Sequence, residues 1–194
     1  MSMHRTLLLS AVVGGGSIGI GATLALAQQG YGGRYDFGAT PSAEEIAAVD
    51  IDAMPDGRGL PPGGGTYREG REVFMTQCAS CHGENLEGIP EVGIGGDRLI
   101  GGRGSLASGT PVKTIESYWP YATTVFDYVK RAMPFHAPGS LTDDEVYAVT
   151  AFILGEAEII GRDDVMNAET LPQVRMPNRD GFVPDPRPDV FNYD

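Results

Sequence analysis

The chain has 194 residues and a formal net charge of −12, from 26 acidic against 14 basic side chains, and it contains only two cysteines. A chain this acidic repels the phosphates of nucleic acid, so we expect no nucleic-acid partner. Two cysteines are too few for a framework of several disulfides or for a four-thiolate zinc site. The length favours one domain with extensions, or at most two small domains.

Residues 1–27 are typical of a secretory signal peptide. They contain no acid, one base at Arg5, and an apolar stretch from Leu7 to Ala27 that ends in Ala-Leu-Ala. An uncleaved membrane anchor is the alternative, because the uncharged stretch is nearly as long as a bilayer requires. Five glycines between positions 14 and 21 weaken such a helix. We therefore expect cleavage before Gln28, export to the periplasm, and a mature chain without a membrane segment.

Four helices are predicted in the remaining chain. Capping-box spacing marks the start of two of them, at Thr66 with Glu69 and at Thr142 with Glu145. Pro134 disfavours helical geometry at the residue before it and so ends the third. No strand pattern stands out. The four helices are expected to begin near Thr40, Thr66, Pro120 and Thr142 and to end near Val49, Cys78, Ala132 and Gly155.

Composition divides the chain outside the signal peptide into three parts. Residues 28–65 are rich in glycine and proline and form an N-terminal extension. Residues 66–156 hold the three longer helices, with glycine-rich ordered loop over 83–112. Residues 157–194 form a C-terminal extension with five prolines after Leu171, which we expect to wrap a surface or a partner rather than build a core. The fold class is therefore all-α, with irregular extensions at both ends.

The sequence from Cys78 to His82 is C-x-x-C-H. Its two thiols can add across the vinyl groups of a haem, which places the adjacent His82 beneath the iron as a ligand. A thioredoxin-like dithiol is one alternative, but the cysteines end a helix and lead into Gly83 instead of following a strand. Zinc lacks a second pair of ligands, and a disulfide between Cys78 and Cys81 would be strained and would not explain His82. One covalently attached haem c is therefore predicted.

The sixth ligand of the iron is expected to be Met133. It ends a predicted helix, is followed by Pro134, and lies far enough from His82 along the chain to reach the other face of the ring. Met166 and Met176 are the alternative thioethers, and His136 is the alternative nitrogen ligand. Each methionine can also be explained as a residue that fills gaps in the core.

These residues resemble the class I cytochromes c. The resemblance covers residues 66–156 and implies about three to four helices around the haem, with the first and last crossing at Gly70 and Phe152. More narrowly, the chain is similar to cytochrome subunits of periplasmic Sox-type sulfur dehydrogenases and of molybdenum sulfite dehydrogenases. Those subunits often carry two haems, whereas this chain has a single C-x-x-C-H. The narrower resemblance rests on the motifs at 101–104, 117–123, 126–128, 131–134 and 174–181.

Three further residues are candidates around the haem. The indole N–H of Trp119, the only tryptophan, can donate to a haem propionate as tryptophans do in the resembling family, or the ring can simply pack. Arg103, in a glycine loop, can neutralise a propionate or remain a solvated surface residue. The carbonyl of Pro90 can orient His82 through its free ring nitrogen, or Pro90 can simply mark a turn.

The predicted function is single-electron transfer. A haem with His and Met ligands has no open position for substrate, and methionine ligation raises the reduction potential. By resemblance, the donor is a molybdenum-containing sulfite or sulfur dehydrogenase, the acceptor is a downstream cytochrome or oxidase, and this chain is no enzyme by itself. A stand-alone diffusible carrier is the alternative. A haem enzyme or sensor with a labile sixth ligand is a third hypothesis.

Overall fold

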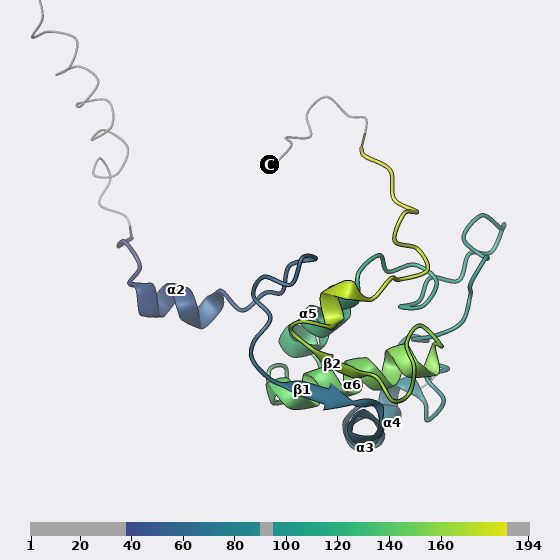
Figure 1. Cartoon of the computed structure of the whole chain (residues 1–194), viewed down its shortest axis with the longest axis horizontal. Helices are drawn as coiled ribbons and strands as arrows, with labels where there is room; N and C mark the ends of the chain where they lie inside the picture. The colour runs from purple at the N-terminus through teal and green to yellow at the C-terminus, as the bar shows by residue number, and fades with distance from the viewer. Residues whose placement is uncertain (1–37, 90–94, 186–194) are drawn as a thin grey trace, which may run out of the picture. The chain divides into compact units, whose positions relative to one another are not determined.

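The structure is a computed structural model that describes residues 38–89 and 95–185. The predicted signal peptide at 1–27 and the predicted contact of Pro90 lie outside the described residues. The chain divides after Ala43 into two units, and the second, Glu44–Asp194, contains the fold described here. The elements of the described ranges follow in this order (Figure 1): α2 (Ala43–Val49), β1 (Gly64–Thr66), α3 (Tyr67–Gln77), α4 (Ala79–His82), α5 (Ala122–Ala132), α6 (Asp143–Glu156), β2 (Val165–Asn167) and the 3-10 helix η1 (Leu171–Gln173).

Both predicted capping boxes are present. The backbone N–H of Thr66 donates to the Glu69 carboxylate at 2.9 Å, and that of Thr142 donates to the Glu145 carboxylate at 2.8 Å. In each box the threonine hydroxyl accepts the returning bond from the glutamate N–H. These bonds satisfy amides that a helix start leaves unpaired, which fixes where α3 and α6 begin.

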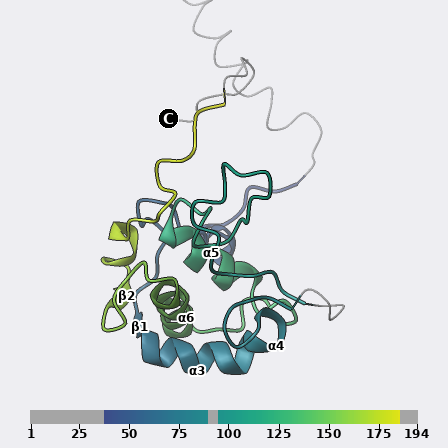
Figure 2. The same cartoon turned by 90° about the vertical axis from the view of Figure 1, so that its right-hand side faces the viewer.

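Helix α6 forms the centre of the core. Every residue from Val146 to Gly155 is buried, which is typical of a helix covered on all sides. Helix α3 is seen end-on in Figure 1 and lengthwise in Figure 2, and α6 the other way round, so the two cross steeply. Gly155 does not end α6 as predicted, because the helix continues to Glu156. Instead Gly155 lies under the Tyr67 ring, where a Cβ would come within 2.7 Å of Tyr67 Cδ2.

Described parts of both extensions pack against the helices. Strand β1 from the N-terminal side pairs antiparallel with β2 from the C-terminal side, with Gly65 opposite Met166. These two three-residue strands were not predicted. Met166, Leu171 and Met176 are 3%, 0% and 1% exposed and belong to the core cluster. The prediction that the C-terminal extension builds no core is therefore wrong over this part of it.

Two hydrogen bonds attach residues of the N-terminal extension to the helices. The Tyr147 hydroxyl of α6 donates to the Pro61 carbonyl at 2.8 Å, and the Ala53 N–H donates to the Asp127 carboxylate of α5 at 2.9 Å. The regular secondary structure of the described residues is thus mainly helical, as predicted, with a short two-stranded ladder joining the extensions. Along these ranges no helix combines the length and the apolar character needed to cross a bilayer.

Candidate haem-binding site

The two cysteines and His82 lie in a single tight turn at the end of α3. The Cys78 N–H donates to the Phe74 carbonyl at 2.9 Å, and the N–H groups of Cys81 and His82 both donate to the Cys78 carbonyl, at 3.1 and 3.0 Å. Both thiols are half-buried and free of any disulfide. The local backbone therefore holds two thiols and an imidazole within one turn of helix, as the C-x-x-C-H sequence predicts.

The Cys78 thiol is held in its neutral form. Burial, and next the neighbouring Cys81, raise the pKa of Cys78 to about 11. Redox dithiols and zinc sites act through thiolates and usually carry lowered pKa values. Within the described ranges, no three His, Cys, Asp or Glu side chains gather where they could hold a metal ion. The raised pKa of Cys78 therefore disfavours a redox dithiol and a thiolate zinc site.

The imidazole of His82 is oriented by the loop that follows it. Its Nδ1 lies 2.7 Å from the Asp97 carbonyl oxygen. Because a carbonyl only accepts, Nδ1 carries the hydrogen, and Nε2 keeps the lone pair that an iron ion requires. Gly96, the residue before Asp97, packs on the His82 ring, because a Cβ at Gly96 would lie 2.5 Å from His82 Cε1. The Gly96 N–H also donates to the Cys81 carbonyl at 2.8 Å.

The Asp97 carbonyl is a functional group that sequence reasoning missed. A backbone carbonyl has no side-chain signature, so the sequence alone does not single out Asp97. The glycine before Asp97 was the only available signal, because a glycine is needed where a backbone passes close to a ring.

Met133 is placed at the end of α5. Its N–H donates to the Val129 carbonyl at 3.0 Å, and its half-buried side chain packs against the core cluster that Cys78 and Trp119 also border. The rival thioethers of Met166 and Met176 are almost fully covered by protein side chains. His136 is exposed. Of the three candidate thioethers, Met133 is therefore the one that is partly exposed and is held at the end of a helix.

Trp119 and Arg103 lie on the long loop before α5. The half-buried Trp119 ring meets the Tyr128 ring of α5 edge-on, with centroids 5.7 Å apart and an interplanar angle of 88°. The Arg103 guanidinium pairs with the Glu116 carboxylate at 2.6 Å and donates to the Ala157 carbonyl at the end of α6. A cation there offsets the negative end of the helix dipole. Neither partner of Arg103 was predicted.

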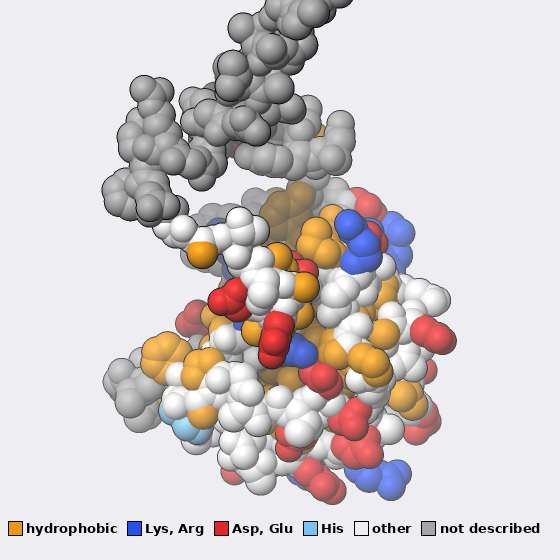
Figure 3. Space-filling model, turned by 90° about the vertical axis from the view of Figure 1, so that its left-hand side faces the viewer, with side chains coloured by type: hydrophobic (Ala, Val, Ile, Leu, Met, Phe, Trp, Pro, Cys, Tyr) orange, Lys and Arg blue, Asp and Glu red, His pale blue; other side chains and the backbone are white. Residues whose placement is uncertain are grey.

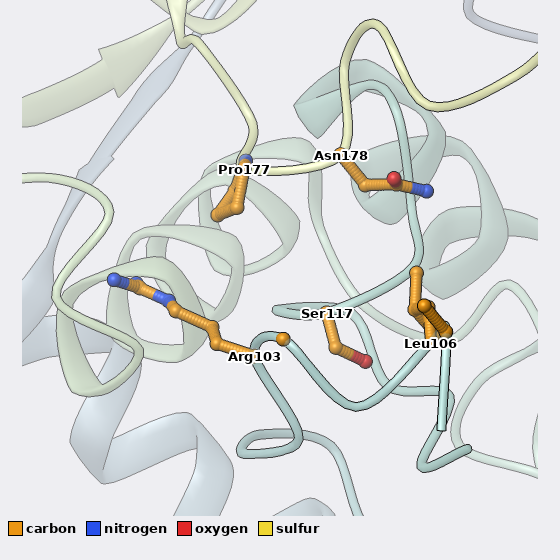
Figure 4. A pocket seen from close by; sticks show the side chains of 7 residues that line it. Arg103, Leu106, Ser117, Pro177 and Asn178 are labelled. Carbon is orange, nitrogen blue, oxygen red and sulfur yellow. The ribbon is translucent and has the colours of Figure 1, made fainter. Parts of the chain in front are cut away.

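Arg103 also lines a small open pocket of about 310 Å³. Figure 4 shows that its walls come from two stretches of chain, the loop before α5 and the C-terminal segment. The labelled side chains are Arg103, Leu106 and Ser117 from the first stretch and Pro177 and Asn178 from the second.

Acidic side chains are scattered over the face of the molecule that Figure 3 shows. On the face shown in Figure 3 they lie at several separate places among neutral and apolar groups, with Lys and Arg in a few positions. This face therefore presents no single acidic patch as a docking site for a basic partner.

Comparison with known proteins agrees with this geometry. The family model described as Cytochrome c matches residues 67–156. A chain in the crystal structure of the sulfane dehydrogenase SoxCD from Paracoccus pantotrophus is 45% identical, with a TM-score of 0.72 over 79% of this chain and 74% of that one. The chain belongs to the cytochrome c family. The cytochrome is also 26% identical over 113 residues to a thiosulfate dehydrogenase of Stutzerimonas stutzeri (strain A1501), of which it spans only 33%.

Family membership settles the fold class and the kind of cofactor. The helices around the Cys78–His82 turn form the class I cytochrome c fold, and the family attaches haem c covalently through this motif. The residues present fit that group: two free thiols lie in one turn, and the contact with Asp97 leaves Nε2 of the histidine available. The chain is thus an electron-transfer cytochrome related to proteins of sulfur oxidation.

Proposed function

We propose that this cytochrome carries one haem c and accepts single electrons from a sulfur-oxidising dehydrogenase. Cys78 and Cys81 would hold the group, and His82 and Met133 would ligate its iron. The observation that carries the proposal is the hydrogen bond from His82 Nδ1 to the Asp97 carbonyl, which keeps the hydrogen on Nδ1 and leaves the Nε2 lone pair available to a metal ion. When bound, the haem supplies a one-electron couple.

Each protein group has a defined task in this proposal. The Asp97 carbonyl holds the hydrogen on Nδ1 and makes the imidazole a stronger ligand. As a ligand of the iron, Met133 would leave no position open to substrate and would raise the reduction potential. Electron transfer then needs no proton donor or acceptor on the protein.

Trp119 and Arg103 are proposed to contact the propionates. Trp119 has one N–H donor, and the residue is half-buried. A guanidinium has five N–H donors, and Glu116 and Ala157 engage two of the Arg103 nitrogens. The remaining donors of Arg103 are available for an anionic group.

The proposed donor is a molybdenum-containing sulfite or sulfur dehydrogenase, and the proposed acceptor is a downstream cytochrome or oxidase. The 45% identity to a chain of the sulfane dehydrogenase SoxCD supports a donor that oxidises sulfur compounds. The match to thiosulfate dehydrogenase supports the same substrate class over a shorter range. Residues 1–27, which are typical of a secretory signal peptide, support a periplasmic location for this complex.

The test is gentle purification of the cytochrome from its native source, with haem and molybdenum measured across the same elution peak. We expect the two to co-elute, and the haem to become reduced when sulfite or a sulfane-sulfur donor is added. Haem alone in a small peak, unreduced by either compound, would instead support a diffusible carrier.

A further inference from the structure

A segment of the C-terminal extension, residues 176–182, clamps the loop that carries Trp119. The Asn178 side-chain amide donates to the Tyr118 carbonyl at 2.7 Å. The Arg179 guanidinium lies 4.2 Å from the centre of the Tyr121 ring. The Phe182 ring meets the Tyr118 ring edge-on, with centroids 5.2 Å apart. These three contacts hold the chain on both sides of Trp119.

The clamp is itself anchored to the domain. Met176, at its start, is 1% exposed and belongs to the core cluster. From there the chain turns, because the Arg179 N–H donates to the Met176 carbonyl and the Gly181 N–H to the Asn178 carbonyl, each at 3.1 Å. A Cβ at Gly181 would lie 1.9 Å from Asn178 Oδ1, so the glycine makes room for the amide. The amide is thus built into a fixed turn.

The contact with Tyr118 bears directly on the orientation of Trp119. The Tyr118 carbonyl belongs to the peptide group that joins Tyr118 to Trp119, so a bond to that oxygen fixes the plane from which the Trp119 backbone departs. On the far side, the Trp119 ring rests edge-on against Tyr128. Two contacts therefore restrain Trp119. Its ring packs on Tyr128 of α5, and its backbone follows a peptide group that Asn178 holds in place.

We propose that Asn178 and Arg179 are positioning residues that fix the Trp119 indole toward the haem. The inference rests on the proposed function, in which the indole N–H donates to a propionate. Such a bond neutralises part of the negative charge near the iron, and its loss favours the ferric form. Loosening the clamp lowers the reduction potential without touching any ligand of the iron.

The experiment uses the reduced, ¹⁵N-labelled holocytochrome. Trp119 is the only tryptophan, so its indole N–H gives one resonance that needs no further assignment. Asn178→Ala removes the amide donor, and Arg179→Met, at an exposed position, removes the cation while keeping most of the apolar stem. Gln173→Ala is the matched control, because the Gln173 amide also donates to a carbonyl, that of Glu169 at 2.9 Å, away from the loop.

We expect Asn178→Ala to shift or broaden the indole resonance and to lower the reduction potential. Arg179→Met should have a smaller effect in the same direction, the double variant should exceed both, and Gln173→Ala should match the wild type. Signals of the Met133 methyl group should stay unchanged, which shows that ligation is intact. A double variant with wild-type indole resonance and potential would overturn the clamp.

The variant Trp119→Phe tests the proposed propionate contact of the indole separately from the clamp. A lower potential in Trp119→Phe but not in Asn178→Ala would overturn the clamp and leave the propionate contact standing. An unchanged potential in Trp119→Phe would overturn both the contact and the clamp. Lower potentials in both variants support the two together.

Discussion

Gly70 of α3 lies directly against the backbone of Ala148 in α6. A Cβ at position 70 would come within 1.8 Å of the Ala148 carbonyl oxygen and 2.9 Å of Phe152 Cβ. Beside this contact the Phe74 and Phe152 rings pack with centroids 5.1 Å apart. Because a backbone carbonyl inside a helix cannot swing aside as a side chain can, only glycine permits this crossing. The crossing fixes how α3 lies against α6 and therefore where the turn at Cys78, which follows α3, lies relative to α6.

Gly70→Ala should therefore destabilise the cytochrome in spite of the better helix propensity of alanine. Overpacking typically lowers the unfolding free energy by about 1–3 kcal/mol. A backbone neighbour that cannot move aside puts this site near the upper end, above the roughly 1 kcal/mol by which helix propensity favours alanine. Urea unfolding followed by circular dichroism measures the difference. Arg71→Ala, at the exposed neighbouring position, should stay within about 0.5 kcal/mol of the wild type. Equal stabilities for the two variants would contradict a tight crossing.

Met133→Ala should abolish the methionine–iron charge-transfer absorption and lower the reduction potential, because a thioether ligand stabilises ferrous iron. Visible spectra of the oxidised protein and a redox titration measure the two effects. The reduced variant should also bind carbon monoxide rapidly, since its sixth position is open.

Met176→Ala is the control, because that side chain is buried in the core and is expected to contribute only packing. It should lower the unfolding free energy by about 2–5 kcal/mol and keep the absorption. Loss of the absorption in Met176→Ala but not in Met133→Ala would identify Met176 as the sixth ligand. Rapid carbon monoxide binding by the wild type would instead favour a sensor or enzyme with a labile ligand.

Local signals in the sequence predicted the local features of the fold. The capping boxes at Thr66 and Thr142 and the C-x-x-C-H turn each depend on residues within five positions of one another, so their spacing carries most of the information. The crossing at Gly70 and Phe152 was predicted from the family resemblance, and the structure confirms it.

Features that depend on distant contacts escaped prediction. Strand β1 is Gly-Gly-Thr, and three residues are too few to show the alternation that marks a strand. Met166, Leu171 and Met176 follow no helical or strand period, and the last two each precede a proline, yet tertiary packing buries all three. Deleting residues 157–194 would therefore damage the core, and partner binding is better tested by substitutions on the surface.

Asp127 joins α5 to the N-terminal extension. Its carboxylate accepts from the Ala53 N–H at 2.9 Å and from the Arg131 guanidinium. Burial alone would raise the pKa of Asp127, but these hydrogen bonds and the Arg131 charge outweigh it and lower the pKa below its usual 3.8. The stabilisation is therefore present at neutral pH and is lost as the pH falls below about 4, through the lowered pKa of the folded state.

Asp127→Asn should lower the unfolding free energy at neutral pH by about 1–2 kcal/mol, because the amide keeps one acceptor but loses the ion pair. The difference from wild type should shrink as the pH approaches 3, where the wild-type carboxyl also begins to lose its charge. Urea unfolding at a series of pH values measures this. Asp180→Asn, which removes an exposed pair with Arg175, should change little throughout. A gap that stays constant with pH would show that ionisation is not the cause.

Tyr147 ties α6 to the N-terminal extension and sets an alkaline limit to stability. Its ring lies 4.4 Å from the centre of the Phe126 ring, and its hydroxyl donates to the Pro61 carbonyl at 2.8 Å. Burial, and next the Asp143 carboxylate, raise the pKa of Tyr147 to about 12 from its usual 10.0. Because the folded pKa is the higher one, this contribution is complete below pH 10 and is lost as the pH rises toward 12.

Tyr147→Phe should cost about 1 kcal/mol at neutral pH, the worth of one hydrogen bond and of the carbonyl it leaves unpaired. Between pH 10 and 12 the wild type should lose up to about 1.4 kcal/mol per pH unit more than the variant, because phenylalanine has no proton to release. Urea unfolding at pH 7, 10, 11 and 12 gives both slopes. Tyr128→Phe, at a ring that is 48% exposed, should follow the wild-type slope. Parallel slopes for wild type and Tyr147→Phe would mean that other groups set the alkaline limit.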